Sequence, residues 1–155
     1  MPEVAVDAPD FSLHSSAFKE ISLSSFRGQK NVVLVFFPAA FTGVCTKELC
    51  TFENELNQFN THDTQVLGLT VDGPHPTGEF VKQNNISFPV LCDVHREVIT
   101  KYDAVFNNFG IPGYSVATRS VFVIDKFGTL RWKWYAPNPG VEPDYEEIMS
   151  VISSL

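Results

Sequence analysis

The feature that most constrains the fold is a continuous apolar run followed by a helical pattern. Residues 31–37 read NVVLVFF, a β-branched and aromatic run typical of a strand buried on both faces. Pro38 ends this strand because proline has no amide for a central ladder. From Gly43 onward apolar residues recur at steps of four, three, four and three, which predicts one face of an amphipathic helix. These residues are Cys45, Leu49, Phe52, Leu56 and Phe59.

The rest of the chain alternates between expected strands and helices. Further strands are expected at residues 65–71 and 120–124, and the second of these forms a hairpin with residues 130–135. Helices are expected near residues 78–84, at 94–102 and from Pro143 onward. Residues 11–26 predict a small N-terminal hairpin. The order indicates an α/β class with a mixed central sheet flanked by helices, similar to the thioredoxin-like fold, with the hairpin as an extension.

Composition narrows the class of protein. The chain has 155 residues, 44% of them apolar, and no linker or repeat, which predicts a single domain over residues 1–155. Eleven basic against eighteen acidic residues give a net charge of -7, which argues against nucleic acid or anionic lipid as a partner. The longest apolar stretch, residues 32–41, is too short to cross a membrane. The first residues show no signal-peptide pattern, so a cytoplasmic protein is expected.

Three cysteines, Cys45, Cys50 and Cys92, are expected to be thiols in a reducing compartment. Cys92 follows an apolar run, and burial is its favoured role. The pair Cys92 and His95 has a metal-like spacing, but two ligands without two more are a weak signal. The histidines share no common spacing and are expected on the surface. No metal site is therefore expected.

Cys45 lies where the buried strand gives way to the helix. Thr42 is expected to cap that helix by accepting a hydrogen bond from the amide of Val44 or Cys45. The remaining free amides and the positive end of the helix dipole favour negative charge, so this thiol should ionise more readily than a free cysteine. The alternative is that Cys45 is only a small buried side chain on the apolar face of the helix.

Two segments carry a resemblance to a known family. The pattern Pro38-x-x-x-Thr42-x-x-Cys45 after a buried strand resembles the active-site signature of peroxiredoxins. Residues 118–126 (TRSVFVIDK) resemble the arginine-bearing strand of that family. The likeness covers nearly the whole chain and is closest to the branch of peroxiredoxin Q (bacterioferritin comigratory protein) and alkyl hydroperoxide reductase E. It implies a thiol peroxidase that needs no cofactor.

The resemblance assigns a role to each matching residue. Cys45 corresponds to the peroxidatic cysteine, and Thr42 to the threonine whose hydroxyl contacts thiolate and peroxide. Pro38 corresponds to the proline that shields the thiolate from water, and Arg119 to the arginine that stabilises thiolate and peroxide. An arginine at the edge of a buried strand also needs an anionic partner, unless it ends in solvent. Glu48, one helical turn beyond Cys45, is expected to pair with Arg119 or another base and to orient it.

The spacing of Cys45 and Cys50 resembles one peroxiredoxin Q subtype in which the second cysteine resolves the first as an intramolecular disulfide. Five residues along a helix correspond to about 500° of rotation and roughly 7.5 Å of rise. This exceeds the roughly 7 Å that a disulfide allows between Cα atoms, so the helix must unwind locally. Otherwise Cys50 is passive, and an external thiol resolves Cys45. Thioredoxin or a similar redoxin is the expected reductant of a two-cysteine enzyme.

Other functions stay open at this stage. A thiol–disulfide reductase would normally carry Cys-x-x-Cys, which this chain lacks. A non-catalytic thioredoxin-fold interaction module is the other alternative. Phenylalanines near the site, Phe36, Phe37 and Phe41, suggest tolerance of organic hydroperoxides besides hydrogen peroxide. Neither the preferred peroxide nor the choice between monomer and homodimer follows from the sequence.

Overall fold

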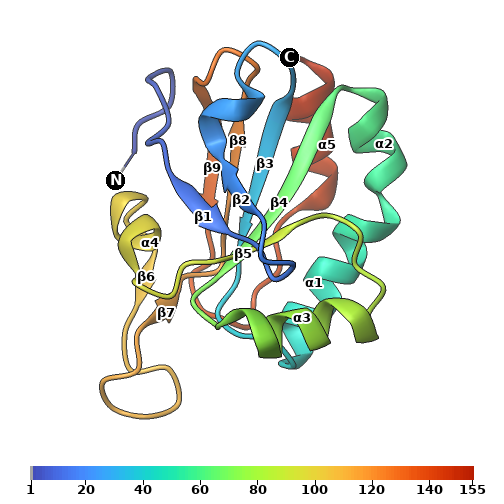
Figure 1. Cartoon of the computed structure of the whole chain (residues 1–155). Helices are drawn as coiled ribbons and strands as arrows, with labels where there is room; N and C mark the ends of the chain where they lie inside the picture. The colour runs from blue at the N-terminus through green and yellow to red at the C-terminus, as the bar shows by residue number, and fades with distance from the viewer. Residues whose placement is uncertain (1) are drawn as a thin grey trace.

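The computed structural model describes residues 2–155, and a five-stranded mixed sheet forms its centre (Figure 1). The strand order is β5-β4-β3-β8-β9. β3 runs parallel to β4, β4 parallel to β5, and β8 is antiparallel to both β3 and β9. The strands of this sheet are β3 (Asn31–Phe36), β4 (Thr64–Thr70), β5 (Val90–Cys92), β8 (Ser120–Ile124) and β9 (Leu130–Tyr135).

The two faces of the sheet carry separate apolar cores because successive side chains of a strand point to opposite sides. In β3, Leu34 and Phe36 belong to one core, whereas Val33 and Val35 belong to the other. Every residue of β3 is buried. The uninterrupted apolar run of this segment therefore reflects a strand covered on both faces, as its sequence predicts.

Four helices cover one face of the sheet, and smaller elements cover the other (Figure 1). The helical layer consists of α1 (Gly43–Asn54), α2 (Leu56–Thr61), α3 (Pro74–Gln83) and α5 (Tyr145–Ser153). The opposite layer consists of β1 (Ser12–His14), β2 (Glu20–Ser22), the 3₁₀ helix η1 (Leu23–Phe26), α4 (Glu97–Lys101), β6 (Val105–Phe106) and β7 (Val116–Ala117). β1 and β2 pair antiparallel, which confirms the N-terminal hairpin.

The single helix predicted up to Phe59 is in fact two helices that break at Glu55. Glu55 has φ −92° and ψ 5°, and it ends α1 and begins α2. Phe52 and Phe59 nevertheless pack in the same core, with ring centroids 5.8 Å apart. The apolar spacing is preserved across the break, which is why periodicity alone does not reveal it.

Other differences concern element boundaries and short strands. α3 begins at Pro74 rather than near Gly78, because proline suits the first turn of a helix. α4 is shorter than residues 94–102. β6 and β7 were not predicted, because two residues each are too few to show an alternating pattern. Within residues 2–155, none of the helices has the length and apolar character needed to cross a membrane.

Candidate active site

The site forms where β3 ends and α1 begins. β8 is antiparallel to β3, and its first residue, Ser120, pairs with Phe36, the last residue of β3. Arg119 precedes Ser120, so it lies beside the start of α1, which carries Cys45 and Glu48. The antiparallel register thus brings together residues that are more than 70 positions apart.

One buried guanidinium group binds the three groups around it. Nη2 of Arg119 donates to Sγ of Cys45 at 2.9 Å, and Nη1 donates to Oε1 of Glu48 at 2.7 Å. Nε donates to the carbonyl oxygen of Pro139 at 2.9 Å. The Arg119 side chain is 1% exposed, and Cys45 and Glu48 are fully buried. Arg119 therefore does not end in solvent, and its anionic partners lie on one turn of α1.

The electrostatics of the site follow from one cation facing two acidic groups. Burial raises the pKa of Glu48 to about 8, although the charge of Arg119 and its hydrogen bond oppose this shift. Burial disfavours the charge on Arg119, but Glu48 and Cys45 outweigh it and raise the pKa of Arg119. The second carboxyl oxygen of Glu48, Oε2, has no hydrogen-bond partner within residues 2–155. Glu48 thus holds its proton more tightly than an ordinary carboxyl group.

Thr42 occupies the N-cap position of α1, but the expected capping bond is wrong. No side chain accepts a hydrogen bond from the first-turn amides, and the Thr42 hydroxyl instead donates to the carbonyl oxygen of Ala39 at 3.0 Å. This bond orients the hydroxyl within the loop before the helix. The amides at the start of α1 consequently stay uncapped by side chains, and they and the helix dipole favour an anion at Cys45.

The loop between β3 and α1 is held by residues that the sequence analysis did not single out. The Ala40 amide donates to Oδ2 of Asp72 at 2.9 Å. Phe41 adopts a left-handed backbone conformation with φ 62°. Its ring is edge-on to that of Phe80 in α3, with ring centroids 5.5 Å apart. Pro38 is buried. Asp72 closely follows β4, and since β4 is parallel to β3, this position could have indicated it.

Cys50 is not brought together with Cys45. It is half-buried on α1, and its Sγ lies 3.8 Å from Oδ1 of Asn84, beyond the end of α3. α1 is continuous from Gly43 to Asn54, so both cysteines belong to one unbroken helix. All three cysteines are free thiols.

Cys92 ends β5 and is 6% exposed. Burial raises the pKa of this thiol, with a contribution in the same direction from Asp72 and an opposing one from Thr77. Burial is thus the environment predicted for Cys92. The four histidines are exposed, as expected. Across residues 2–155, no three His, Cys, Asp or Glu side chains group together in a way that could hold a metal ion.

A segment beyond β9, residues 136–144, also contacts the site and was not predicted to do so. We call it the strap. Its first amide, that of Ala136, donates to the carbonyl oxygen of Arg119 at 2.8 Å, and its Pro139 accepts from Nε of the same arginine. Glu142 of the strap pairs with Lys47 of α1 at 3.0 Å. The strap therefore holds Arg119 through its backbone carbonyl and through Nε, the guanidinium nitrogen that neither Cys45 nor Glu48 uses.

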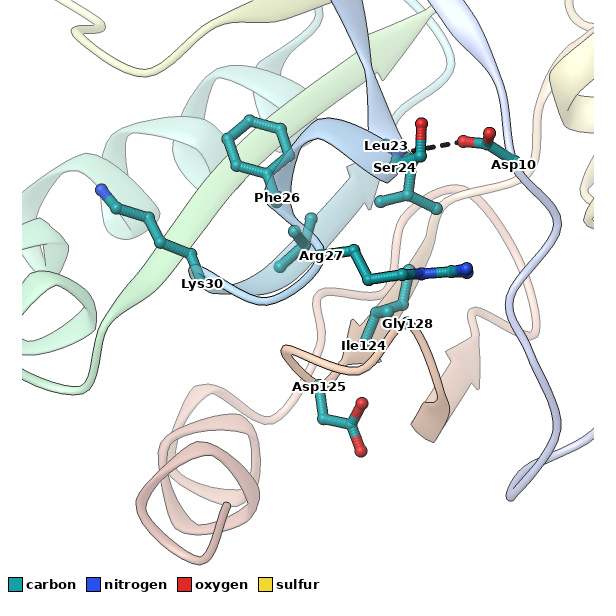
Figure 2. A pocket seen from close by; sticks show the side chains of 10 residues that line it. Asp10, Leu23, Ser24, Phe26, Arg27, Lys30, Ile124, Asp125 and Gly128 are labelled. Carbon is teal, nitrogen blue, oxygen red and sulfur yellow. Dashed lines mark hydrogen bonds between the residues drawn. The ribbon is translucent and has the colours of Figure 1, made fainter.

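A crevice at the other end of the sheet is unrelated to this site (Figure 2). Arg27, Asp125 and Gly128 are among its lining residues, and it lies where β3 begins and β8 ends. Its volume of about 10 Å³ is close to that of one water molecule. It is too small for a substrate.

Cys45 is buried in the first turn of a helix and accepts a hydrogen bond from an arginine. On a mixed sheet of this topology, such a cysteine defines a thiol-based redox enzyme. Residues 4–133 match the AhpC/TSA family, and the chain belongs to that family. It is 38% identical over 135 residues to alkyl hydroperoxide reductase E of Mycobacterium tuberculosis, which covers 85% of this chain and 84% of the relative. Peroxiredoxin 2 of Picrophilus torridus is 34% identical over 136 residues, covering 84% of this chain and 64% of the relative.

Solved structures show the same fold. The crystal structure of peroxidoxin BcpB from Mycobacterium tuberculosis superposes with a TM-score of 0.87, at 21% identity, over 100% of this chain and 99% of that one. A peroxiredoxin 6 variant of Arenicola marina gives a TM-score of 0.90, at 21% identity, over 99% and 73% of the two chains. The thioredoxin-like fold expected from the order of elements is confirmed.

The protein is therefore a peroxiredoxin of the branch that the sequence indicated, a thiol peroxidase whose substrates are a peroxide and a thiol reductant. Family membership sets aside both alternatives, the thiol–disulfide reductase and the non-catalytic interaction module.

Proposed function

We propose that Cys45 is the residue that reduces the peroxide. Its thiolate attacks one peroxide oxygen, so an S–O bond forms and the O–O bond breaks. The leaving oxygen takes up a proton and departs as water or an alcohol, and Cys45 becomes a sulfenic acid. The observation that carries this proposal is the 2.9 Å hydrogen bond from Arg119 to Cys45 in a fully buried setting.

The neighbouring residues act on the charge that moves during this step. Arg119 stabilises the thiolate and, as charge shifts, the leaving oxygen, because fixed donors are most effective where charge develops. Glu48 orients Arg119 through its bond to Nη1. Thr42 keeps its hydroxyl oxygen free to accept from a peroxide while it donates to Ala39. Pro38, which is buried, limits the access of water to the thiolate.

We further propose that Cys50 resolves the sulfenic acid. The Cys50 thiolate attacks Sγ of Cys45, the S–S bond forms, the S–O bond breaks, and the oxygen leaves as water once it is protonated. The two cysteines lie five positions apart in α1, so the residues between them must leave the helical conformation first. Thioredoxin or a similar dithiol protein then reduces the disulfide by exchange.

One observation favours a second scheme, in which an external thiol attacks Cys45 directly. The Cys50 thiol is hydrogen-bonded to Asn84 at the end of α3, whereas the Cys45 thiol is hydrogen-bonded to Arg119 at the start of β8. The two thiols thus face different elements as long as α1 is intact. In this one-cysteine scheme α1 does not unwind, and Cys50 is a structural residue.

The remaining features of the cycle follow the same reasoning. Phe41 is 54% exposed beside the site and offers an apolar surface to organic hydroperoxides, so both these and hydrogen peroxide are proposed substrates. Three free thiols fit a reducing compartment, and we propose the cytoplasm. The protein acts as a monomer or a homodimer. No nucleic acid, membrane, metal or organic cofactor takes part in this scheme.

The test is the intact mass of the reduced protein seconds after one equivalent of hydrogen peroxide. A loss of about 2 Da that Cys50→Ser abolishes is expected for a two-cysteine enzyme, whereas a stable gain of about 16 Da supports the one-cysteine scheme. The Cys50→Ser variant should itself stop at the sulfenic acid. An unchanged mass in the wild type would remove Cys45 from the reaction.

A further inference from the structure

Two ion pairs and one buried side chain attach the segment between the two cysteines to the rest of the molecule. Leu49 is packed in the core, and Glu48 binds Arg119. Nζ of Lys47 lies 3.0 Å from Oε2 of Glu142 in the strap. Any unwinding that brings Cys50 to Cys45 moves all three residues, because all three lie within the five-residue interval.

Glu142 is itself fixed in place. Its Oε1 accepts a hydrogen bond from the hydroxyl of Tyr145 at 2.7 Å. Burial alone raises the pKa of Glu142, but the Tyr145 hydroxyl and Lys47 outweigh it and lower that pKa. Tyr145 begins α5, and its ring stands edge-on to Phe52 of α1 at 5.5 Å. The carboxylate that holds Lys47 is therefore charged and anchored to a packed helix.

The strap connects this anchor to the catalytic arginine. It is bonded to Arg119 through Ala136 and Pro139 and to α1 through Glu142. The strap is thus attached at one end to the residue that stabilises the thiolate. At the other end it is attached to the helical turn that must open after oxidation.

We propose that Glu142 is a positioning residue of the resolving step, which keeps residues 45–50 helical through Lys47 and so sets how fast Cys50 reaches Cys45. This inference rests on the proposed function, in which Cys50 is the resolving cysteine. Glu142 touches neither the substrate nor a sulfur atom. It acts through Lys47, and it lengthens the time that Cys45 remains a sulfenic acid.

The size of the effect follows from the exposure of the pair. The Lys47 side chain is 72% exposed and that of Glu142 is 22% exposed, so the pair is partly screened by solvent. Exposed ion pairs of this kind correspond to rate changes of about two- to fivefold, and we expect about threefold. A slower closure also favours a second oxidation, in which the sulfenic acid attacks another peroxide, gains an oxygen and releases water as a sulfinic acid forms.

The experiment measures oxidation and closure separately on the full-length reduced protein. Hydrogen peroxide is mixed rapidly with the protein, and samples are quenched with acid for intact mass. The sulfenic acid forms at a rate that depends on peroxide concentration, whereas the disulfide forms at a rate that does not. Glu142→Gln removes the charge but keeps an oxygen for Tyr145, and Lys47→Met keeps the apolar stem. The control is Arg131→Gln, which removes an exposed ion pair to Asp125 outside the site.

The expected result is about threefold faster disulfide formation in Glu142→Gln and Lys47→Met, determined separately from the rate of Cys45 oxidation in the same samples. The exchange of charges in Lys47→Glu with Glu142→Lys should restore the slow closure, and high salt should shrink the difference. Less sulfinic acid should accumulate in Glu142→Gln at excess peroxide. Arg131→Gln should behave as the wild type.

Two results overturn the inference and can be told apart. If the wild type forms the disulfide but Glu142→Gln closes at the same rate, Glu142 has no such role while Cys50 remains the resolving cysteine. The same conclusion follows if Glu142→Gln slows only the first oxidation, since the strap would then act through Arg119. If the wild type stops at the sulfenic acid, resolution by Cys50 is wrong, and the inference falls with it.

Discussion

Two buried cysteines at the same edge of the sheet differ in their electrostatic surroundings. Cys45 follows β3, and Cys92 ends the parallel strand β5. Both are almost inaccessible, at 0% and 6% exposure. Arg119 donates to Cys45 at 2.9 Å, whereas burial is the largest influence on Cys92 and raises the pKa of that thiol. A hydrogen bond with Thr77 opposes this shift, and the nearby carboxylate of Asp72 adds to it.

The comparison shows that burial does not make a cysteine reactive. Desolvation disfavours the thiolate, and a cation together with unpaired helix amides is needed to reverse this. At Cys45 the cation is buried as well, and its Nη1 is hydrogen-bonded to Glu48. The thiol that we propose as reactive is therefore the one whose surroundings come from three segments, the start of α1, the start of β8 and the strap.

The largest effect on peroxide reduction is expected when the two buried cysteines are replaced one at a time. Cys45→Ser should abolish peroxide reduction, because a serine hydroxyl is not oxidised by peroxide. Cys92→Ser should reduce peroxide at the wild-type rate, since Cys92 has no cation to stabilise a thiolate. Both variants are measured by peroxide consumption with dithiothreitol as reductant. Loss of activity in Cys92→Ser with an intact circular dichroism spectrum would contradict this difference between the two cysteines.

The second prediction concerns the cation. Arg119→Met should lower the rate constant for oxidation of Cys45 about 10²- to 10³-fold, as expected for the loss of a preorganised donor. Because this change also leaves Glu48 buried without its partner, Arg119→Met combined with Glu48→Gln serves as the control for folding. Stopped-flow fluorescence of Trp132 and Trp134 offers a readout. A double variant that oxidises at the wild-type rate would show that burial and the helix amides are sufficient.

The third prediction uses the raised pKa of Glu48. The pKa of Glu48 is about 8 in the folded protein against an ordinary value of 4.5 for a glutamate, so the folded state binds more protons than the unfolded state between these values. Folding stability contributed by this proton is therefore present at low pH and is lost as pH rises from about 4.5 to 8. Its slope is at most about 1.4 kcal/mol per pH unit.

Glu48→Gln should flatten that part of the profile, because glutamine carries no proton to lose. Urea unfolding of the reduced wild type and the variant at several pH values between 5 and 8 measures the difference. The two proteins differ only at position 48, so the difference between their profiles reports on Glu48. Parallel profiles would mean that Glu48 is already ionised at pH 5 by its pairing with Arg119.

The smallest expected effect is the loss of folding stability when Cys92 is replaced. Cys92→Ala should cost about 1 kcal/mol of unfolding free energy, since it removes one buried sulfur from a packed edge. Iodoacetamide at neutral pH should label Cys92 more slowly than Cys50 in the Cys45→Ser background, because the Cys92 pKa is raised by burial. Peptide mass mapping over time gives both rates. Faster labelling of Cys92 would indicate local opening at the end of β5.

Much of the local structure could be predicted because it depends on residues close together in the chain. The apolar run of β3 and the hairpin of β8 and β9 were found with nearly correct boundaries, since alternation and turn residues are local signals. The break at Glu55 and the capping of α1 were not. At Glu55 the apolar spacing continues across the break, so periodicity does not reveal it. At Thr42 a hydrogen bond from the hydroxyl to Ala39 takes the place of the expected cap.

The candidate site divides in the same way. The pattern from Pro38 to Cys45 and the position of Glu48 one turn later are properties of a single segment, and they could be read directly. Asp72, Pro139 and Glu142 could not, because they contribute through contacts with distant parts of the chain. Pro139 contributes only its backbone carbonyl, a group that every residue has and that sequence therefore cannot single out.

Residues close together in the chain thus specify a buried strand, a helix with a cysteine in its first turn, and the amino acids available for thiol chemistry. Which of those amino acids meet depends on the tertiary structure. The antiparallel register of β3 and β8 places Arg119 against Cys45 and Glu48, and the path of the chain after β9 brings Glu142 to Lys47. Periodicity reports which side of an element is apolar, whereas the partner of a buried charge depends on strand order, register and chain path, which are fixed only when the whole sheet has formed.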